Sequence, residues 1–107
     1  MKVIEVSTLK QWMDDKVDFQ LIDIRERYEY DWCHIEGCEL IPMGEILNQV
    51  DRISRDKEVV MHCNSGKRAE ALIDVLESNF QFNNLINLTG GIEAWVDKYA
   101  PEKVAER

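Results

Sequence analysis

Residues 59–68 read Val-Val-Met-His-Cys-Asn-Ser-Gly-Lys-Arg, and this stretch decides both the fold and the chemistry of the chain. Val59-Val60-Met61 predicts a buried strand, whereas the residues that follow Arg68 have the spacing of an amphipathic helix. Cys63 is therefore expected where a strand ends and a helix begins. A helix N-terminus offers unpaired N–H groups and a positive dipole end, which favour a thiolate and bind anions. With the positive charges of Lys67 and Arg68 beside it, the cysteine is suited to nucleophilic attack on a small anion.

Apolar and helical patterns alternate along the rest of the chain. Strands are predicted at 3–6, 19–24, 38–41, 58–62 and 85–88, and helical segments at 9–13, 25–32, 46–53, 69–80 and 92–99. Ser7 or Thr8 is expected to cap the first helix. Strands that alternate with helices indicate an α/β fold with a parallel sheet covered on both faces. We expect one domain over residues 1–107, with a core from about 4–99 and a C-terminal tail at 101–107.

Several polar and glycine residues follow the predicted strands directly. Asp23 and Arg25 come at the end of the second strand, and Gly90-Gly91 comes after the fifth. Since ligands of parallel sheets bind at the carboxyl ends of the strands, these residues are expected to meet Cys63 at one edge. Asp23 is expected to accept hydrogen bonds from the cysteine loop or to pair with Arg25, and so to brace the loop.

The composition excludes several classes of partner. The formal net charge is −8, so the chain is a poor ligand for nucleic acid or for an anionic membrane. No apolar run approaches the length of a membrane span, and the first residues have no signal-peptide pattern. The odd count of three cysteines excludes a complete disulfide framework. We expect a cytoplasmic protein. Because its net negative charge repels small anions at long range, any anion site must be formed by a few groups close to the anion.

Four stretches, taken in order, resemble the single-domain rhodaneses, which are thiosulfate-type sulfurtransferases. They are Asp23-Ile24-Arg25-Glu26, the stretch from His34 to Pro42, the loop from Cys63 to Arg68, and Gly90-Gly91-Ile92-Glu93-Ala94-Trp95. The resemblance covers roughly residues 4–99. It implies a three-layer α/β/α fold with a central five-stranded parallel sheet.

The resemblance also implies a mechanism that needs no cofactor and no metal. Cys63 would attack the outer sulfur of thiosulfate or a similar donor and become a persulfide, which cyanide, a thiol or a protein acceptor would then discharge. The backbone N–H groups of the loop would cradle the anion, and Lys67 and Arg68 would draw and orient the donor. The substrate-binding residues implied are Asn64, Ser65, Gly66, Lys67 and Arg68.

Two other functions are compatible with the same fold. A phosphatase or arsenate reductase is disfavoured, because the related phosphatases have five residues between cysteine and arginine and this chain has four. A shorter loop makes a tighter ring of N–H groups, which favours sulfur transfer. A non-catalytic persulfide carrier or protein-interaction module would keep Cys63 but would turn over free thiosulfate slowly.

The remaining cysteines and histidines have structural interpretations. His62 is expected to point away from Cys63, because neighbouring strand residues face opposite sides of a sheet. His34 is expected to hold a turn. Cys38 is expected in the core and Cys33 in a turn, at a position where the resemblance implies glycine, with the alternative that either thiol accepts sulfur from Cys63. A zinc site among these residues matches no structural zinc spacing. The three tryptophans are expected to be packing residues.

Overall fold

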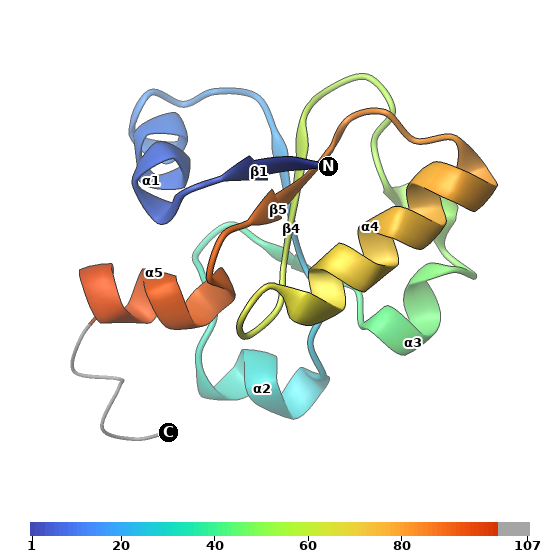
Figure 1. The fold of residues 1–107 in the computed structure, drawn as a ribbon. Coiled ribbons are helices and arrows are strands. Elements are labelled where there is room, and N and C mark those ends of the chain that lie inside the picture. The colour runs from blue at the N-terminus through green and yellow to red at the C-terminus, as the bar shows by residue number, and fades with distance from the viewer. Residues whose placement is uncertain (101–107) are drawn as a thin grey trace.

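The computed structural model describes residues 1–100 and shows a parallel sheet between two layers of helices (Figure 1). The elements are β1 (Lys2–Ile4), α1 (Val6–Asp14), β2 (Gln20–Asp23), α2 (Arg27–Trp32), β3 (Glu39–Leu40), α3 (Met43–Ile46), η1 (Val50–Arg52), β4 (Val59–His62), α4 (Lys67–Phe80), β5 (Leu85–Leu88) and α5 (Gly91–Tyr99). The expected tail at 101–107 lies outside the described residues.

The five strands run parallel in the order β1-β5-β4-β2-β3. Both β4 and β5 are buried at every position, as expected for strands with helices on both faces. The predicted α/β/α fold with a five-stranded parallel sheet is therefore confirmed. Within residues 1–100, no helix is both long and apolar enough to span a membrane.

The sheet separates two hydrophobic cores. On one face, Met61 packs with buried residues of α4, including Leu72 and Ile73. On the other face, Val60 packs with Leu9 of α1 and with residues of α5. Figure 1 shows α4 and α3 on one side of the sheet and α1 and α5 on the other. Because successive residues of β4 enter opposite cores, the central strand is fixed in register.

The boundary between the first strand and the first helix differs from the prediction. Val6 was expected in the first strand, but it begins α1 and is buried. The helix is capped by Glu5, whose carbonyl accepts the N–H groups of Thr8 and Leu9, and no side chain caps it. The expectation of a Ser7 or Thr8 cap was wrong. Val6 lies three residues before Leu9, which places both on one face of a helix. Val6 therefore suits the start of this helix as well as the end of a strand.

The predicted helical segment at 46–53 is broken in two. α3 ends at Ile46, and η1 begins at Val50. Between them, the N–H groups of Asn48 and Gln49 bond to carbonyls three residues earlier, which tightens and ends the turn. Leu47, which has the helical spacing of Ile46, Val50 and Ile53 in the sequence, is 45% exposed. Apolar spacing alone therefore overestimated the length of this helix.

Candidate active site: the cysteine loop between β4 and α4

Cys63 lies directly after β4, and three residues separate it from the first residue of α4. The Gly66 N–H donates a hydrogen bond to the Cys63 Sγ over 3.1 Å. Gly66 is the N-cap of α4 and has a φ of +104°, a conformation that residues with a Cβ rarely adopt. The loop therefore returns on itself and aims a backbone donor at the sulfur, as the sequence predicted for a cysteine at a helix start.

The N-terminus of α5 supports the loop from its other side. The Ile92 N–H donates to the Cys63 carbonyl over 2.9 Å, and the Glu93 N–H donates to the Asn64 carbonyl over 3.0 Å. Gly91 allows this approach, because a Cβ at Gly91 would lie 2.5 Å from each of these two carbonyl oxygens. The predicted meeting of Gly90-Gly91 with Cys63 at one sheet edge is confirmed.

Asn87 anchors the loop from within the sheet and was not identified from the sequence. This residue of β5 is buried, and its Nδ2 donates to the Gly66 carbonyl over 3.1 Å. A polar side chain in the otherwise apolar strand Leu85–Leu88 was the available signal, since buried amides normally hold a hydrogen-bond partner.

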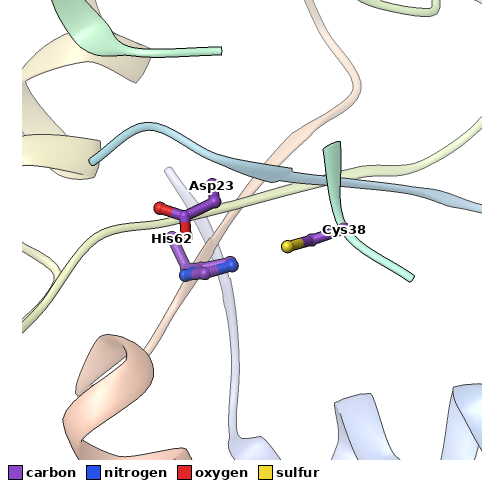
Figure 2. Close-up of side chains that lie close together, drawn as sticks. All are labelled: Asp23, Cys38 and His62. Carbon is purple, nitrogen blue, oxygen red and sulfur yellow. The ribbon is translucent and has the colours of Figure 1, made fainter. Parts of the chain in front are cut away.

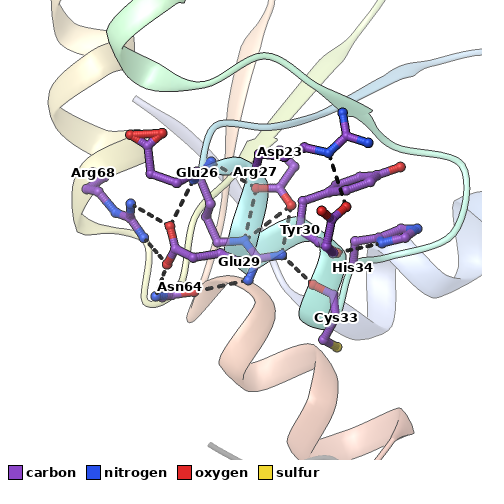
Figure 3. A network of polar contacts seen from close by, with 11 residues as sticks. Asp23, Glu26, Arg27, Glu29, Tyr30, Cys33, His34, Asn64 and Arg68 are labelled. Carbon is purple, nitrogen blue, oxygen red and sulfur yellow. Dashed lines mark hydrogen bonds and ion pairs between the residues drawn. The ribbon is translucent and has the colours of Figure 1, made fainter.

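Asp23 and Arg25 form a buried ion pair beside the loop. Their side chains are 0% and 1% exposed, and Arg25 Nη2 lies 2.8 Å from Asp23 Oδ2. Arg25 also donates from Nη1 to Asn64 Oδ1 over 3.3 Å and from Nη2 to the Cys33 carbonyl. The predicted pairing is confirmed, and Arg25 connects the ion pair to the cysteine loop through Asn64. Figure 3 shows Asp23, Cys33 and Asn64 in one network of polar contacts.

Arg68 is bound to a carboxylate that the sequence did not identify as part of the site. Its two terminal nitrogens lie 3.2 and 3.1 Å from the Glu29 carboxylate oxygens, and Asn64 Nδ2 also donates to Glu29. Burial opposes ionisation of Glu29, but hydrogen bonds from Arg68, the Glu26 backbone and Asn64 outweigh it and lower the pKa of Glu29. Of the two cations expected beside the cysteine, Arg68 is thus neutralised, and Lys67 is exposed.

A cavity of about 350 Å³ adjoins the loop. Its wall is formed by α2, α5 and the loop residue Asn64, and the lining residues are Arg25, Tyr28, Glu29, Trp32, Cys33, Asn64, Ile92, Glu93 and Val96. The expectation that all three tryptophans are packing residues was wrong for Trp32, which is 39% exposed and lines this cavity. Trp12 and Trp95 pack against the core as expected.

The other two cysteines differ in their surroundings. Cys38 is partly buried, and burial raises the pKa of its thiol to about 12, which disfavours the thiolate that sulfur transfer needs. Cys33 is buried and lines the cavity, with a φ of −165°. That value is ordinary extended backbone, so the strain suggested by a glycine-like turn position is absent at Cys33.

The two histidines are not part of the cysteine loop. His34 Nδ1 lies 2.8 Å from the Tyr30 carbonyl, and its ring stacks on Tyr30, which agrees with the predicted structural role. His62 and Asp23 are fully buried and lie next to the partly buried Cys38, and one ligand atom from each of these three residues lies within 4.8 Å of the others (Figure 2). Arg25 already neutralises Asp23, so a divalent cation placed among these three side chains would meet a buried positive charge.

Comparisons with known proteins agree with the fold. Residues 5–98 match the model of the rhodanese-like domain family. A putative sulfurtransferase of Bacillus subtilis, YtwF, is 32% identical over 95% of this chain and 99% of its own length. The crystal structure of a rhodanese-like domain protein from Staphylococcus aureus superposes with a TM-score of 0.81 at 27% identity, covering 89% of this chain and 91% of that one.

A longer relative matches over only part of its length. The probable adenylyltransferase/sulfurtransferase MoeZ of Mycobacterium tuberculosis is 35% identical over 90% of this chain, but the chain spans only 25% of the length of that protein. The family match nevertheless covers most of the residues that the structure describes, including every strand after β1. The chain therefore belongs to the rhodanese-like domain family.

Proposed function

We propose that this protein is a sulfurtransferase that carries sulfane sulfur as a persulfide on Cys63. It takes the sulfur from thiosulfate or a similar donor and passes it to a thiophilic acceptor such as cyanide or a thiol, which can belong to a protein. The single observation that carries the proposal is the hydrogen bond of 3.1 Å from the Gly66 N–H to the Cys63 Sγ, in a loop held between β4, α4 and α5.

The chemistry follows from this geometry in two steps. The Cys63 thiolate attacks the outer sulfur of thiosulfate, the S–S bond of the donor breaks, and sulfite leaves with the electron pair. The negative charge on the new outer sulfur is stabilised by the N–H groups at the start of α4, which have no partner within the helix. Cyanide then attacks the outer sulfur, thiocyanate leaves, and the Cys63 thiolate is restored.

Two features disfavour the phosphatase and arsenate reductase alternatives. Four residues separate Cys63 from Arg68, one fewer than in the related phosphatases. The Arg68 guanidinium is also engaged by Glu29, so it is not directed at the oxygens of a phosphoryl group in the cysteine loop. Because Arg68 is engaged by Glu29, it also contributes less to the binding of thiosulfate. A persulfide carrier would turn over thiosulfate slowly, so the rate with this donor distinguishes a carrier from an efficient thiosulfate sulfurtransferase.

Intact mass spectrometry tests the proposal directly. Incubation with thiosulfate, or with inorganic polysulfide if thiosulfate reacts slowly, should add the mass of one sulfur atom, and cyanide should remove it. Cys63→Ser should take up no sulfur, whereas Cys38→Ala should behave as the parent. Uptake that is fast with polysulfide and slow with thiosulfate would identify a carrier. Absence of any adduct on folded protein would contradict sulfur transfer and favour a non-catalytic interaction module.

A further inference from the structure

Two of the cations near the loop, Arg25 and Arg68, are neutralised by carboxylates. Arg25 is paired with Asp23, and Arg68 with Glu29, which leaves little positive charge for an anionic substrate in the adjoining cavity. Glu93 lines this cavity and is exposed, and no hydrogen bond or ion pair to its carboxylate is seen among residues 1–100. The wall of the cavity therefore carries a net negative charge, in a chain whose formal charge is already −8.

The same cavity presents aromatic surface to solvent. Tyr28 and Trp32 lie four residues apart on α2, so they occupy the same side of that helix. They are 74% and 39% exposed, yet both line the cavity together with the apolar residues Ile92 and Val96. Aromatic faces combined with an unpaired carboxylate attract organic cations rather than small inorganic anions.

The size and position of the cavity indicate what it holds. A volume of about 350 Å³ is at the lower end of the range for small-molecule sites and exceeds what a single reacting sulfur needs. The cavity touches the cysteine loop at Asn64, and its lining residue Ile92 bonds to the Cys63 carbonyl. A molecule in the cavity therefore lies against Asn64, the residue that follows Cys63 in the loop, while Cys63 itself is not among the lining residues.

We infer that the sulfur acceptor of Cys63 is a small organic thiol with a positive charge, an aminothiol, whose body occupies this cavity with its ammonium group near Glu93. This inference rests on the proposed function. In the transfer step, the thiolate of the aminothiol attacks the outer sulfur of the Cys63 persulfide. The S–S bond of the Cys63 persulfide breaks, and the Cys63 thiolate leaves with the electron pair. The aminothiol departs as a persulfide that carries the transferred sulfur.

The test compares two small thiols of opposite charge. Wild-type protein is loaded with inorganic polysulfide, and loading is confirmed by intact mass. The rate of discharge is then measured with cysteamine and with mercaptoacetate, each rate being divided by the thiolate fraction of that thiol. Wild-type protein should be discharged faster by cysteamine. Glu93→Gln should reduce the ratio of the two rates by about two- to five-fold, which is the strength of an exposed ion pair.

Asp74→Asn provides the matched control. Asp74 is exposed on α4 and is not among the residues that line the cavity, so this variant changes the net charge by the same amount and should leave the ratio unchanged. A second variant, Trp32→Ala, should slow discharge by cysteamine more than discharge by mercaptoacetate, since it removes an aromatic face from the cavity.

The possible results separate the two proposals. Failure of the folded wild-type protein to load with polysulfide would overturn the proposed sulfurtransferase function. Normal loading followed by equal rates, or by faster discharge with mercaptoacetate, would overturn the aminothiol inference and leave sulfur transfer intact. An equal fall of the ratio in Asp74→Asn and Glu93→Gln would also overturn the inference, because the preference would then reflect overall charge and not the cavity.

Discussion

Gly91→Ala should both destabilise the fold and impair the cysteine loop. Gly91 begins α5 with a φ of +58°, and a Cβ built on it lies 2.5 Å from the carbonyl oxygens of Cys63 and Asn64. Real Cβ atoms essentially never approach backbone oxygen so closely, so α5 and the loop must move apart. That movement breaks or lengthens the hydrogen bonds from the N–H groups of Ile92 and Glu93 to the same two oxygens.

The cost has two parts. A residue with a Cβ in the left-handed region costs about 1–2 kcal/mol. Each of the two hydrogen bonds contributes about 0.5–1.5 kcal/mol to stability, so losing both costs about 1–3 kcal/mol. The free energy of unfolding should therefore fall by about 2–5 kcal/mol in Gly91→Ala, measured by urea denaturation with an unchanged m-value. Sulfur uptake by Cys63 should slow as well, since the displaced loop no longer presents the Gly66 N–H to the sulfur.

Gly37→Ala isolates the contribution of the backbone conformation. Gly37 has a φ of +89°, but nothing lies within 4 Å of a Cβ built there. This variant should lose only about 1–2 kcal/mol and keep the parental rate of sulfur uptake. If Gly91→Ala is no less stable than Gly37→Ala, or if it transfers sulfur at the parental rate, the contact between α5 and the loop does not hold the site, and the reasoning is wrong.

Four further predictions concern charged and nucleophilic groups. Arg25→Met should cost about 3–5 kcal/mol in urea denaturation, because it leaves the Asp23 carboxylate buried and unpaired, and Asp23→Asn combined with it should recover part of the loss. Burial lowers the pKa of His62 from 6.5 to about 4, so the unfolded chain binds more protons between these values. The free energy of unfolding should therefore fall, by at most about 3 kcal/mol, as the pH drops from 6.5 to about 4, and His62→Phe should flatten this slope. Cys63→Ser should lose all cyanide-dependent thiocyanate release, since a hydroxyl is not ionised at neutral pH; residual release would assign the persulfide to another thiol. Lys67→Ala should raise the KM for thiosulfate at low salt, where steering is strongest, and an unchanged KM would make Lys67 a plain surface charge.

Much of the fold could be predicted because its signals are local. The buried strand Val59–His62 and the apolar stripe of α4 are continuous in the sequence, and their alternation with other elements indicates a parallel sheet. The errors fell where a local signal was ambiguous. Val6 suits both a strand and a helix start, and apolar spacing continues past Ile46 although the backbone turns there. Only packing against the sheet distinguishes these alternatives.

The candidate site was predictable in its cysteine and its glycines but not in its carboxylate. Gly66 and Gly91 stand out in the sequence at the ends of predicted strands, and both have positive φ angles in the structure; at Gly91 a close contact with backbone oxygens also requires glycine. Glu29 was missed, because nothing in its neighbourhood indicates that an arginine 39 residues away will reach it. Its local signal, a capping box with Glu26 at the start of α2, points only to a helix terminus. Long-range pairing of charges across a loop leaves no periodic trace in the sequence.

In the proposed sulfur transfer, the pairing of charges around the loop limits which groups can stabilise the sulfur. Arg25 and Arg68 are used to hold Asn64 and Glu29 in place, so their charges stabilise the shape of the loop rather than a bound substrate. Stabilisation of a sulfur anion then depends on backbone N–H groups at the start of α4, whose positions are set by Asn87, Gly91 and the α5 N-terminus. Backbone donors do not distinguish one sulfane sulfur from another. Under the proposed function, selectivity then comes from what lies beyond the reacting atom, and the acidic, aromatic cavity between α2 and α5 is where we place the acceptor.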